Sequence, residues 1–300
     1  MTLSPRSLLP LLCASVTLHA VAAPMPLSAY LALHGPAPTA TYAYGAAPSQ
    51  FAELFVPAGK GPFPVAVLVH GGCWTRQFGG ITQLRNMAGA LRARGIAVWN
   101  VEYRRVDETG GGYPGTYQDI NAALDLLAAT APERGLDLQR IVAVGHSAGG
   151  QLVQWIAGRS RIAASSPLYQ ARPLPVRHVV SLGGLADLRG EQALIKSSCD
   201  RDMVDLTGVP SATRPDVFSD TNAAQLMPNG SHTVLVTGEL DTVSPPRVAQ
   251  DYAAKALKAG DRAEVVILPG ASHYDEVAAT SAAWPTVLEV IEMALQTLTQ

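Results

Sequence analysis

Residues 140–150 read RIVAVGHSAGG, and this stretch decides how the rest of the chain is interpreted. Ile141 to Val144 form a short apolar, β-branched run that predicts a buried strand. The next five residues, Gly145 to Gly149, match the pattern G-x-S-x-G, and apolar residues at helical spacing follow in 152–156. A strand, a sharp turn and a helix around this pattern predict a nucleophile elbow, which presents the hydroxyl of Ser147 at the tip of the turn.

The spacing of small residues agrees with that geometry. Gly145 and Gly149 lie two residues on either side of Ser147, where larger side chains would collide in a tight turn. The N–H of Ala148 would then point toward the serine oxygen, and the beginning of a helix adds positive potential where negative charge develops. The alternative is a chance match in a glycine-rich chain, which the strand before and the helix after it disfavour.

Composition sets broad limits on the protein class. The chain has 300 residues, of which 48% are hydrophobic and 15% charged, enough for one large domain with a sizeable core. Such a composition excludes a disordered chain. The net charge of -2 provides no basic field for nucleic acid. Without internal repeats or a low-complexity linker, residues 23–300 are predicted to form one domain.

The N-terminal residues 1–22 have the pattern of a secretory signal peptide. Arg6 precedes an apolar run over residues 8–21, and Ala20-Val21-Ala22 fits the A-x-A cleavage site. Cleavage after Ala22 is favoured because a cut one residue later would leave Pro24 at the new terminus. The run is too short to cross a bilayer. We therefore expect an exported protein, secreted or periplasmic, with no membrane association after cleavage.

Two cysteines, Cys73 and Cys199, would remain after cleavage of the signal peptide. Export makes a disulfide between them possible, because oxidising compartments allow such bonds to persist. Two partly buried free thiols are the alternative. Both interpretations stay open at the level of the sequence.

Strand-like and helix-like segments alternate along the chain. This alternation predicts an α/β fold with a mostly parallel central sheet and helices on both faces. Residues 23–49 show no periodicity and are expected to be an extended lead-in, whereas 186–227 are expected to form a small cap-like insertion over the carboxyl edge of the sheet. The predicted strands are 50–56, 64–70, 96–101, 141–144, 176–182, 233–237 and 263–268, and the predicted helices are 82–94, 117–129, 246–259 and 282–298.

The predicted strand 64–70 continues into His70-Gly71-Gly72-Cys73-Trp74. Two glycines allow the backbone to bend close to a ligand and to direct its N–H groups inward. Acyl-transfer enzymes need such donors for the oxyanion of the tetrahedral intermediate, and each is worth about 3 kcal/mol. A glycine-rich turn without function is the alternative, but its occurrence together with a downstream elbow favours the functional interpretation.

A serine hydroxyl is a weak nucleophile that needs a base, and the base needs a carboxylate to orient it. Of the seven histidines, His273 alone lies in a loop after a strand late in the chain. Asp241, in the loop after the preceding strand, is the predicted carboxylate, and Glu239 is its rival. The chain order Ser147, Asp241, His273 is the order expected for α/β-hydrolases.

Four motifs carry a family resemblance: HGGCW at 70–74, VEYRR at 101–105, GGGYPGTYQD at 110–119 and GHSAGG at 145–150. With them the chain resembles the α/β-hydrolase superfamily, in the esterase/lipase branch with the His-Gly-Gly oxyanion motif. Within that branch it is similar to the kynurenine formamidase-like and small-ester carboxylesterase group. The resemblance implies the α/β-hydrolase fold and an oxyanion hole formed by the N–H groups of Gly72, Cys73 and Ala148.

Together these features predict a secreted serine hydrolase that cleaves small carboxylic esters through an acyl-enzyme. Arylformamidase or peptidase activity with the same residues, and a non-enzymatic binding protein on this scaffold, are the alternatives. Trp74, Tyr103 and His146 are candidate substrate contacts, with core packing as an equal possibility for the first two. Without metal-ligand spacing or a phosphate-binding loop, we expect no metal and no cofactor. The oligomeric state stays open.

Overall fold

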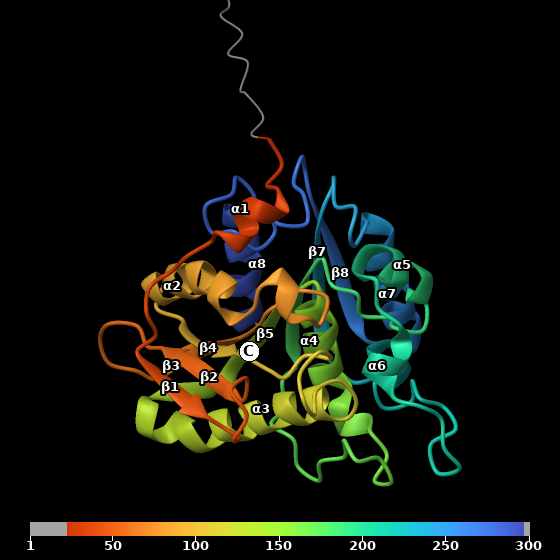
Figure 1. Cartoon of the computed structure of the whole chain (residues 1–300). Coiled ribbons are helices and arrows are strands. Elements are labelled where there is room, and N and C mark those ends of the chain that lie inside the picture. Colours follow the sequence, from red (N-terminus) through yellow and green to blue (C-terminus); the bar gives the residue numbers. More distant parts are fainter. Residues whose placement is uncertain (1–22, 297–300) are drawn as a thin grey trace, which may run out of the picture.

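The computed structural model describes residues 23–296, so the predicted signal peptide lies outside the described residues (Figure 1). An eight-stranded sheet has the order β1-β2-β4-β3-β5-β6-β7-β8. The first three strands in this order pair antiparallel, and β4 and all later ones run parallel. The strands are β1 (Ala40–Ala43), β2 (Phe51–Phe55), β3 (Phe63–Val69), β4 (Ala97–Val101), β5 (Leu136–His146), β6 (His178–Leu182), β7 (His232–Gly238) and β8 (Arg262–Leu268).

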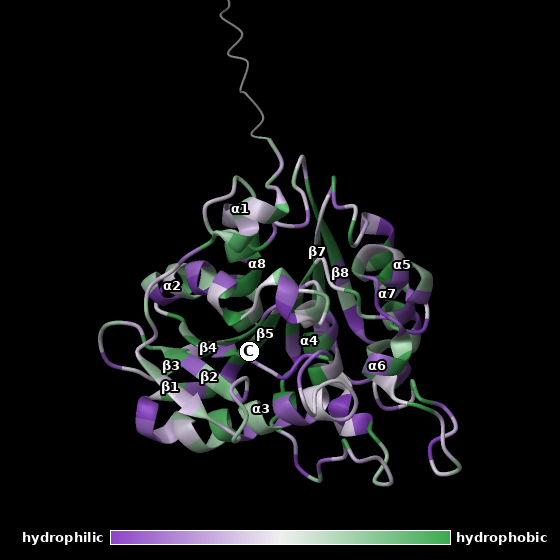
Figure 2. Cartoon of the chain, viewed as in Figure 1, coloured by the Kyte–Doolittle hydropathy of each residue, from purple (hydrophilic) through white to green (hydrophobic). Residues whose placement is uncertain are grey.

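Helices cover both faces of the sheet, as the alternating pattern predicts. Residues from α3, α4 and α7 pack on one face, and residues from α2 and α8 pack on the other. Figure 2 shows hydrophobic residues concentrated on the central strands. The helices are α1 (Leu27–Leu31), α2 (Arg85–Ala93), α3 (Gly115–Arg134), α4 (Ala148–Gly158), α5 (Gln192–Cys199), α6 (Met203–Thr207), α7 (Pro246–Ala259) and α8 (Trp284–Gln296).

The continuous apolar run of β3 follows from burial on both faces. Successive side chains of a strand point to opposite sides. Val65 and Val67 accordingly belong to the cluster packed against α3 and α4, whereas Ala66 and Leu68 belong to the cluster packed against α2 and α8. All four are fully buried. Because the strands from β3 to β8 pair in parallel, the carboxyl ends of β3, β5, β7 and β8 lie at one edge of the sheet.

Two regions differ from the sequence prediction or refine it. The expected extended lead-in contains α1 and β1, which are too short, at five and four residues, for periodicity to reveal them. The expected cap-like region contains α5, α6 and a 3-10 turn over Ala223–Leu226. In the described part of the chain, no helix is both long and apolar enough to cross a membrane.

Candidate active site

Ser147 occupies the strained turn between β5 and α4. Its backbone has φ 55° and ψ -118°, and its N–H donates to the carbonyl of Leu182 at 2.9 Å. A Cβ on Gly145 would lie 2.2 Å from the carbonyl oxygen of Gly149, and a Cβ on Gly149 would lie 2.0 Å from that of Val69. The two glycines of the motif are therefore required by the close approach of backbone segments.

The loop after β3 passes directly over this turn. A Cβ on Gly71 would lie 2.7 Å from the carbonyl oxygen of His146 and 2.8 Å from Cβ of Ser147. Gly72, Cys73 and Trp74 follow with φ of 103°, 51° and 55°. For a residue other than glycine, the left-handed region costs roughly 1–2 kcal/mol. The surrounding structure must therefore hold Cys73 and Trp74 in this conformation.

The three predicted oxyanion donors have free N–H groups. Within the described part of the chain, the N–H groups of Gly72, Cys73 and Ala148 donate to no other group. Ala148 is the first residue of α4, so its N–H has no partner within the helix. Buried amides are usually paired, so the unpaired N–H groups of the buried residues Cys73 and Ala148, together with that of the half-buried Gly72, are available to an anionic ligand.

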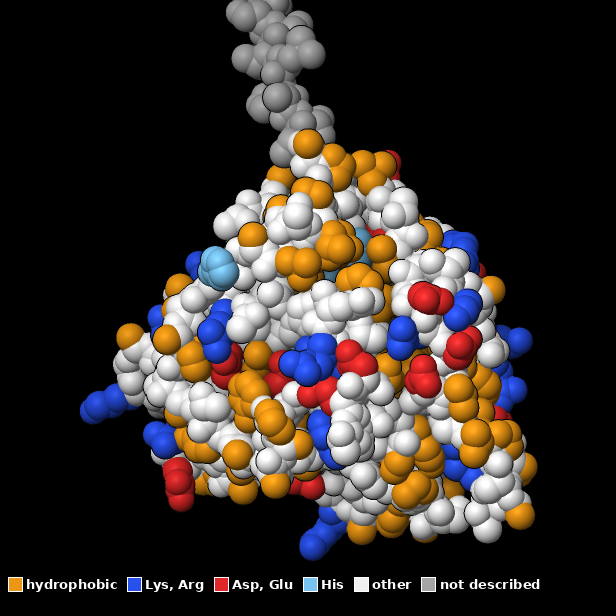
Figure 3. All heavy atoms as spheres, in the orientation of Figure 1, with side chains coloured by type: hydrophobic (Ala, Val, Ile, Leu, Met, Phe, Trp, Pro, Cys, Tyr) orange, Lys and Arg blue, Asp and Glu red, His pale blue; other side chains and the backbone are white. Residues whose placement is uncertain are grey.

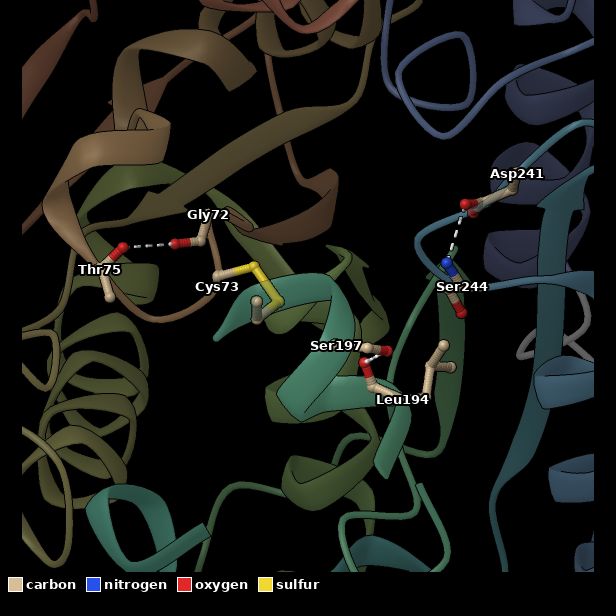
Figure 4. The surroundings of a disulfide bond; sticks show 8 residues. Gly72, Cys73, Thr75, Leu194, Ser197, Asp241 and Ser244 are labelled. Carbon is tan, nitrogen blue, oxygen red and sulfur yellow. Dashed lines mark hydrogen bonds between the residues drawn. A yellow bond between two sulfur atoms is a disulfide. The ribbon is translucent and has the colours of Figure 1, made fainter. Parts of the chain in front are cut away.

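His273 and Asp241 meet at the ends of β7 and β8. Nδ1 of His273 and Oδ2 of Asp241 are 2.7 Å apart, and both side chains are buried. The N–H groups of Val243 and Ser244 donate to Oδ1 of Asp241 at 2.7 and 2.8 Å, which fixes the carboxylate. Figure 4 shows the bond from Ser244. The rival Glu239 instead accepts an N–H from Gly270. Asp241 is thus the carboxylate that contacts the imidazole.

Ser147 and His273 line one cavity of about 50 Å³. Within the described residues no hydrogen bond joins the serine hydroxyl to the imidazole; in unliganded enzymes such bonds are often long or poorly aligned and tighten around substrate. In the space-filling view, imidazole atoms are recessed among hydrophobic side chains (Figure 3). The other lining residues are Leu27, Tyr30, Gly72, Cys73, Phe78, His146, Ser198, Val243 and Tyr274.

A second carboxyl group, that of Glu276, lies behind the Asp241–His273 pair. A Cβ added to Gly183 would lie within 3.0 Å of side-chain atoms of all three residues, so they converge on this glycine. Glu276 is fully buried, accepts the N–H of Gly238 through Oε1, and has no partner for Oε2 among the described residues. Burial, followed by the charge of Asp241, raises the pKa of Glu276 well above its ordinary value. Burial therefore favours the protonated form of this carboxyl group over the charged form.

The structure corrects two of the three candidate substrate contacts. Trp74 and Tyr103 are fully buried in the core cluster and do not line the cavity, because the chain turns their side chains beneath the loop. The Tyr103 ring stacks on His70 at 4.4 Å, and its hydroxyl donates to the His70 carbonyl oxygen at 3.0 Å. Both side chains therefore help to hold the loop after β3 in place from the core side.

His146, the third candidate, lines the cavity wall. Its Nε2 lies 2.9 Å from the carbonyl oxygen of His273, and burial followed by the proximity of His273 lowers the pKa of its ring well below the ordinary value. Potential ligand atoms of His146, His273 and Glu276 lie within 4.8 Å of one another, the one such group in the described chain. Burial disfavours the charged form of Glu276 that a metal ion would need, which makes this group a poor metal site.

The base of the loop after β3 is held by a buried polar cluster. Nε2 of His70 contacts Oε1 of Glu102 at 2.7 Å, and Arg105 contacts the same carboxylate at 2.9 Å. Burial alone would raise the pKa of Glu102, but His70 and then Arg105 outweigh it and lower the pKa to about 2. The carboxylate is therefore charged across the neutral range.

Cys73 and Cys199 form a disulfide, which resolves the alternative left open by the sequence. The bond joins the loop after β3 to the last residue of α5 (Figure 4).

Sequence reasoning missed several contributors to the cavity and its surroundings, among them two residues of α1, Glu276 and Ser198. Tyr30 and Leu27 come from α1, which the sequence did not predict, and the Tyr30 ring stacks on Tyr274 at 5.1 Å. Glu276 lies three residues after His273, and that spacing was the available signal. Ser198 belongs to the cap-like region, whose weak periodicity gave no indication of which residue would face the site.

An α/β sheet with a serine at a strand-to-helix turn, and an Asp–His pair at the same edge, defines the α/β-hydrolase fold expected from the sequence. The BD-FAE family model matches residues 53–256, and the chain belongs to this family. A segment of 114 residues is 35% identical to carboxylesterase NlhH of Mycobacterium tuberculosis, covering 37% of this chain. The match spans only 34% of that relative's length.

Solved structures with the same fold include esterases. Esterase B from Lactobacillus rhamnosis superposes with a TM-score of 0.73 at 22% identity, covering 91% of this chain and 89% of that one. A bacterial heroin esterase gives a TM-score of 0.62 at 26% identity, covering 83% and 79%. The fold and the resemblance to esterases predicted from the sequence are thereby confirmed.

Proposed function

We propose that this protein is a serine hydrolase that cleaves carboxylic esters through an acyl-enzyme. Ser147 attacks the ester carbonyl while His273 takes its proton, and Asp241 fixes the imidazole tautomer and stabilises the imidazolium. The N–H groups of Gly72, Cys73 and Ala148 receive the oxyanion. His273 then protonates the departing alcohol. Water, activated by the same imidazole, releases the carboxylic acid and restores the serine.

The meeting of Ser147 and His273 in one cavity, with Asp241 on the far ring nitrogen, is the observation that supports this proposal most directly. The free amides beside Ser147 add to it, because an oxyanion hole serves acyl transfer and has no use in a simple binding protein. Membership of the BD-FAE family and the similarity to named esterases point in the same direction.

The cavity favours a short acyl chain. Its volume of about 50 Å³ lies far below the several hundred Å³ of pockets for drug-sized ligands. Phe78, Val243 and Tyr274 give it apolar walls. Esters of two- to four-carbon acids should therefore be hydrolysed faster than esters of long-chain acids.

Turnover of a graded substrate panel tests the proposal. Purified protein is assayed on p-nitrophenyl esters of increasing chain length, N-formylkynurenine and an acetylated sugar, with Ser147→Ala as the control. We expect hydrolysis of short esters by the parent protein and none above background by the variant. Equal turnover by both proteins would exclude Ser147 as nucleophile, and exclusive cleavage of the formamide would replace the ester by an arylformamide.

We also propose that the protein is exported after cleavage behind Ala22. The signal-like pattern of residues 1–22 and the Cys73–Cys199 disulfide support this, because structural disulfides persist mainly in oxidising compartments. Intact-mass analysis of protein expressed from the full-length sequence in a bacterial host should give a chain beginning at Ala23 outside the cytoplasm. An uncleaved chain in the cytoplasm would contradict this assignment.

A further inference from the structure

The Cys73–Cys199 disulfide connects two segments of the cavity wall that are far apart in the sequence. Cys73 lines the cavity itself, and Ser198, the neighbour of Cys199, lines it from α5. The two cysteines are 126 positions apart in the chain, and their Cα atoms lie 5.4 Å apart. The bond therefore joins the oxyanion loop, residues 70–74, to the cap-like region at the point where both contact the substrate space.

The carbonyl groups of Gly71, Gly72 and Trp74 each have a hydrogen-bond partner, whereas that of Cys73 has none among the described residues. The carbonyl of Gly71 contacts Nδ1 of His70 at 2.8 Å, that of Gly72 accepts the Thr75 N–H at 2.9 Å, and that of Trp74 accepts the Val106 N–H at 2.9 Å. No backbone hydrogen bond involves Cys73 in the described part of the chain. Its disulfide takes the place of such a tether.

Cys73 is also where the backbone most needs a tether. Its φ of 51° lies in the left-handed region, which residues other than glycine rarely adopt. Trp74, with φ 55°, shares this conformation, but its indole is fully buried in the core. Without the bond to Cys199, the peptide at Cys73 could relax to an extended or right-handed conformation, which would rotate its N–H away from Ser147.

We propose that the disulfide between Cys73 and Cys199 is a positioning device for the oxyanion hole, which holds the Cys73 N–H toward the nucleophile. This inference rests on the proposed esterase function. Transition-state stabilisation then depends on a covalent bond to α5, and the protein reaches full activity only when the bond is formed. The cap-like region acts on catalysis through this bond as well as by shaping the cavity.

Three variants test this inference: Cys199→Ser, Cys73→Ser and the double variant, with Ser197→Ala on the exposed side of α5 as a matched control. We expect each of the three cysteine variants to lower kcat by about 10- to 100-fold. This loss is no greater than the loss caused by removing one oxyanion donor outright, because the N–H remains but is less well placed. KM should change by less than threefold. The double variant should lose no more than either single variant, because both residues form one bond.

A transition-state analogue separates positioning from stability. A trifluoromethyl ketone forms a tetrahedral adduct with an oxyanion, so its affinity should fall in parallel with kcat in the cysteine variants. All assays are run well below the melting temperature. Unchanged kcat and inhibitor affinity together with a lower melting temperature would show that the bond only stabilises the fold and would overturn the inference.

Chemical reduction of the folded protein covers the case in which the variants do not fold. A dithiol reduces the bond by thiol–disulfide exchange, yielding two cysteine thiols and the cyclic disulfide of the reagent. Activity should fall to the level expected for Cys199→Ser and return on reoxidation, while two titratable thiols appear and disappear. Full activity of the reduced, folded protein would overturn the inference alone. Absence of turnover in the oxidised parent protein would overturn the proposed function and the inference with it.

Discussion

The two sides of the proposed catalytic cavity are held in position by different kinds of interaction. On the side of β7 and β8, His273 is fixed by hydrogen bonds among titratable groups, with Asp241 in contact and Glu276 behind. On the side of β3, the oxyanion loop is fixed by glycine conformations, by the buried Trp74 and by a disulfide. The β7–β8 side therefore depends on contacts between side chains, and the β3 side depends on the conformation of the backbone.

This difference separates two ways of losing activity. The imidazole side should respond to changes of charge and protonation that leave the backbone unaltered. The oxyanion side should respond to any substitution that adds a Cβ or releases a constraint, even when no charge changes. Four substitutions, ordered from the largest expected effect to the smallest, test this division.

Replacement of the base should have the largest effect. His273→Ala is expected to lower kcat by about 10⁶-fold, as much as Ser147→Ala, because the residues act as a unit. The control is His232→Ala, which removes a histidine that contacts Glu264 at 2.9 Å, at the opposite end of β7. Kinetics on a short-chain p-nitrophenyl ester measures both. Comparable losses in the two variants would contradict the assignment.

The carboxylate comes next. Asp241→Asn is expected to lower kcat by about 10⁴-fold, because an amide favours the wrong imidazole tautomer. Glu239→Gln, two residues earlier, should stay within twofold of the parent protein, since Glu239 contacts the Gly270 N–H instead of His273. If Glu239→Gln were the more damaging of the pair, the carboxylate would be wrongly assigned.

Gly71→Ala tests the backbone side without changing any charge. The added Cβ would lie 2.7 Å from the His146 carbonyl oxygen, so the loop must move away from Ser147. We expect kcat/KM to fall by about 10²- to 10³-fold, similar to the loss of one oxyanion donor. Gly230→Ala is the control for backbone strain without a clash: a Cβ there has no neighbour within 4 Å, but the φ of 74° disfavours alanine, so stability should fall while kcat/KM stays at the parental value. A Gly71→Ala variant with parental kinetics would contradict the claim that the oxyanion side depends on backbone geometry.

The smallest effect concerns Glu276 and depends on pH. Its pKa is raised in the folded state, so folding is favoured most below the ordinary pKa of 4.5, and this contribution is lost as pH rises through the folded value. Glu276→Gln removes the free-energy cost of ionising a buried carboxyl group and keeps a side-chain oxygen that can accept the N–H of Gly238. Its melting temperature should match the parent at pH 4 and exceed it by about 2–4 °C at pH 8. A gap independent of pH, or of opposite sign, would refute a buried neutral carboxyl group.

Much of this site could be predicted from the sequence because its parts follow strands. The elbow of Ser147 and the loops carrying Asp241 and His273 each come directly after a strand with a recognisable apolar run, and parallel strands bring such loops to one edge. The sheet was predictable for the same reason, since alternating strand and helix patterns admit few topologies.

The parts that the sequence did not predict depend on tertiary contacts without a periodic signal. Trp74 is buried in the core next to a left-handed backbone at 73 and 74, and Tyr103 is buried against His70; no local pattern indicates either position. The short helix α1 is stabilised by burial of Tyr30 and not by its own propensity. The pairing of Cys73 with Cys199 could not be predicted, because it depends on α5 lying close to the oxyanion loop in space.

Covalent labelling by a fluorophosphonate tests the central claim most directly, because it reports an activated serine without any choice of substrate. Peptide mapping of the folded, oxidised protein should find one adduct, on Ser147, and the rate of its formation should fall sharply in His273→Ala. A folded protein that forms no adduct, or forms it on another residue, would contradict the account of Ser147 as a nucleophile activated by His273.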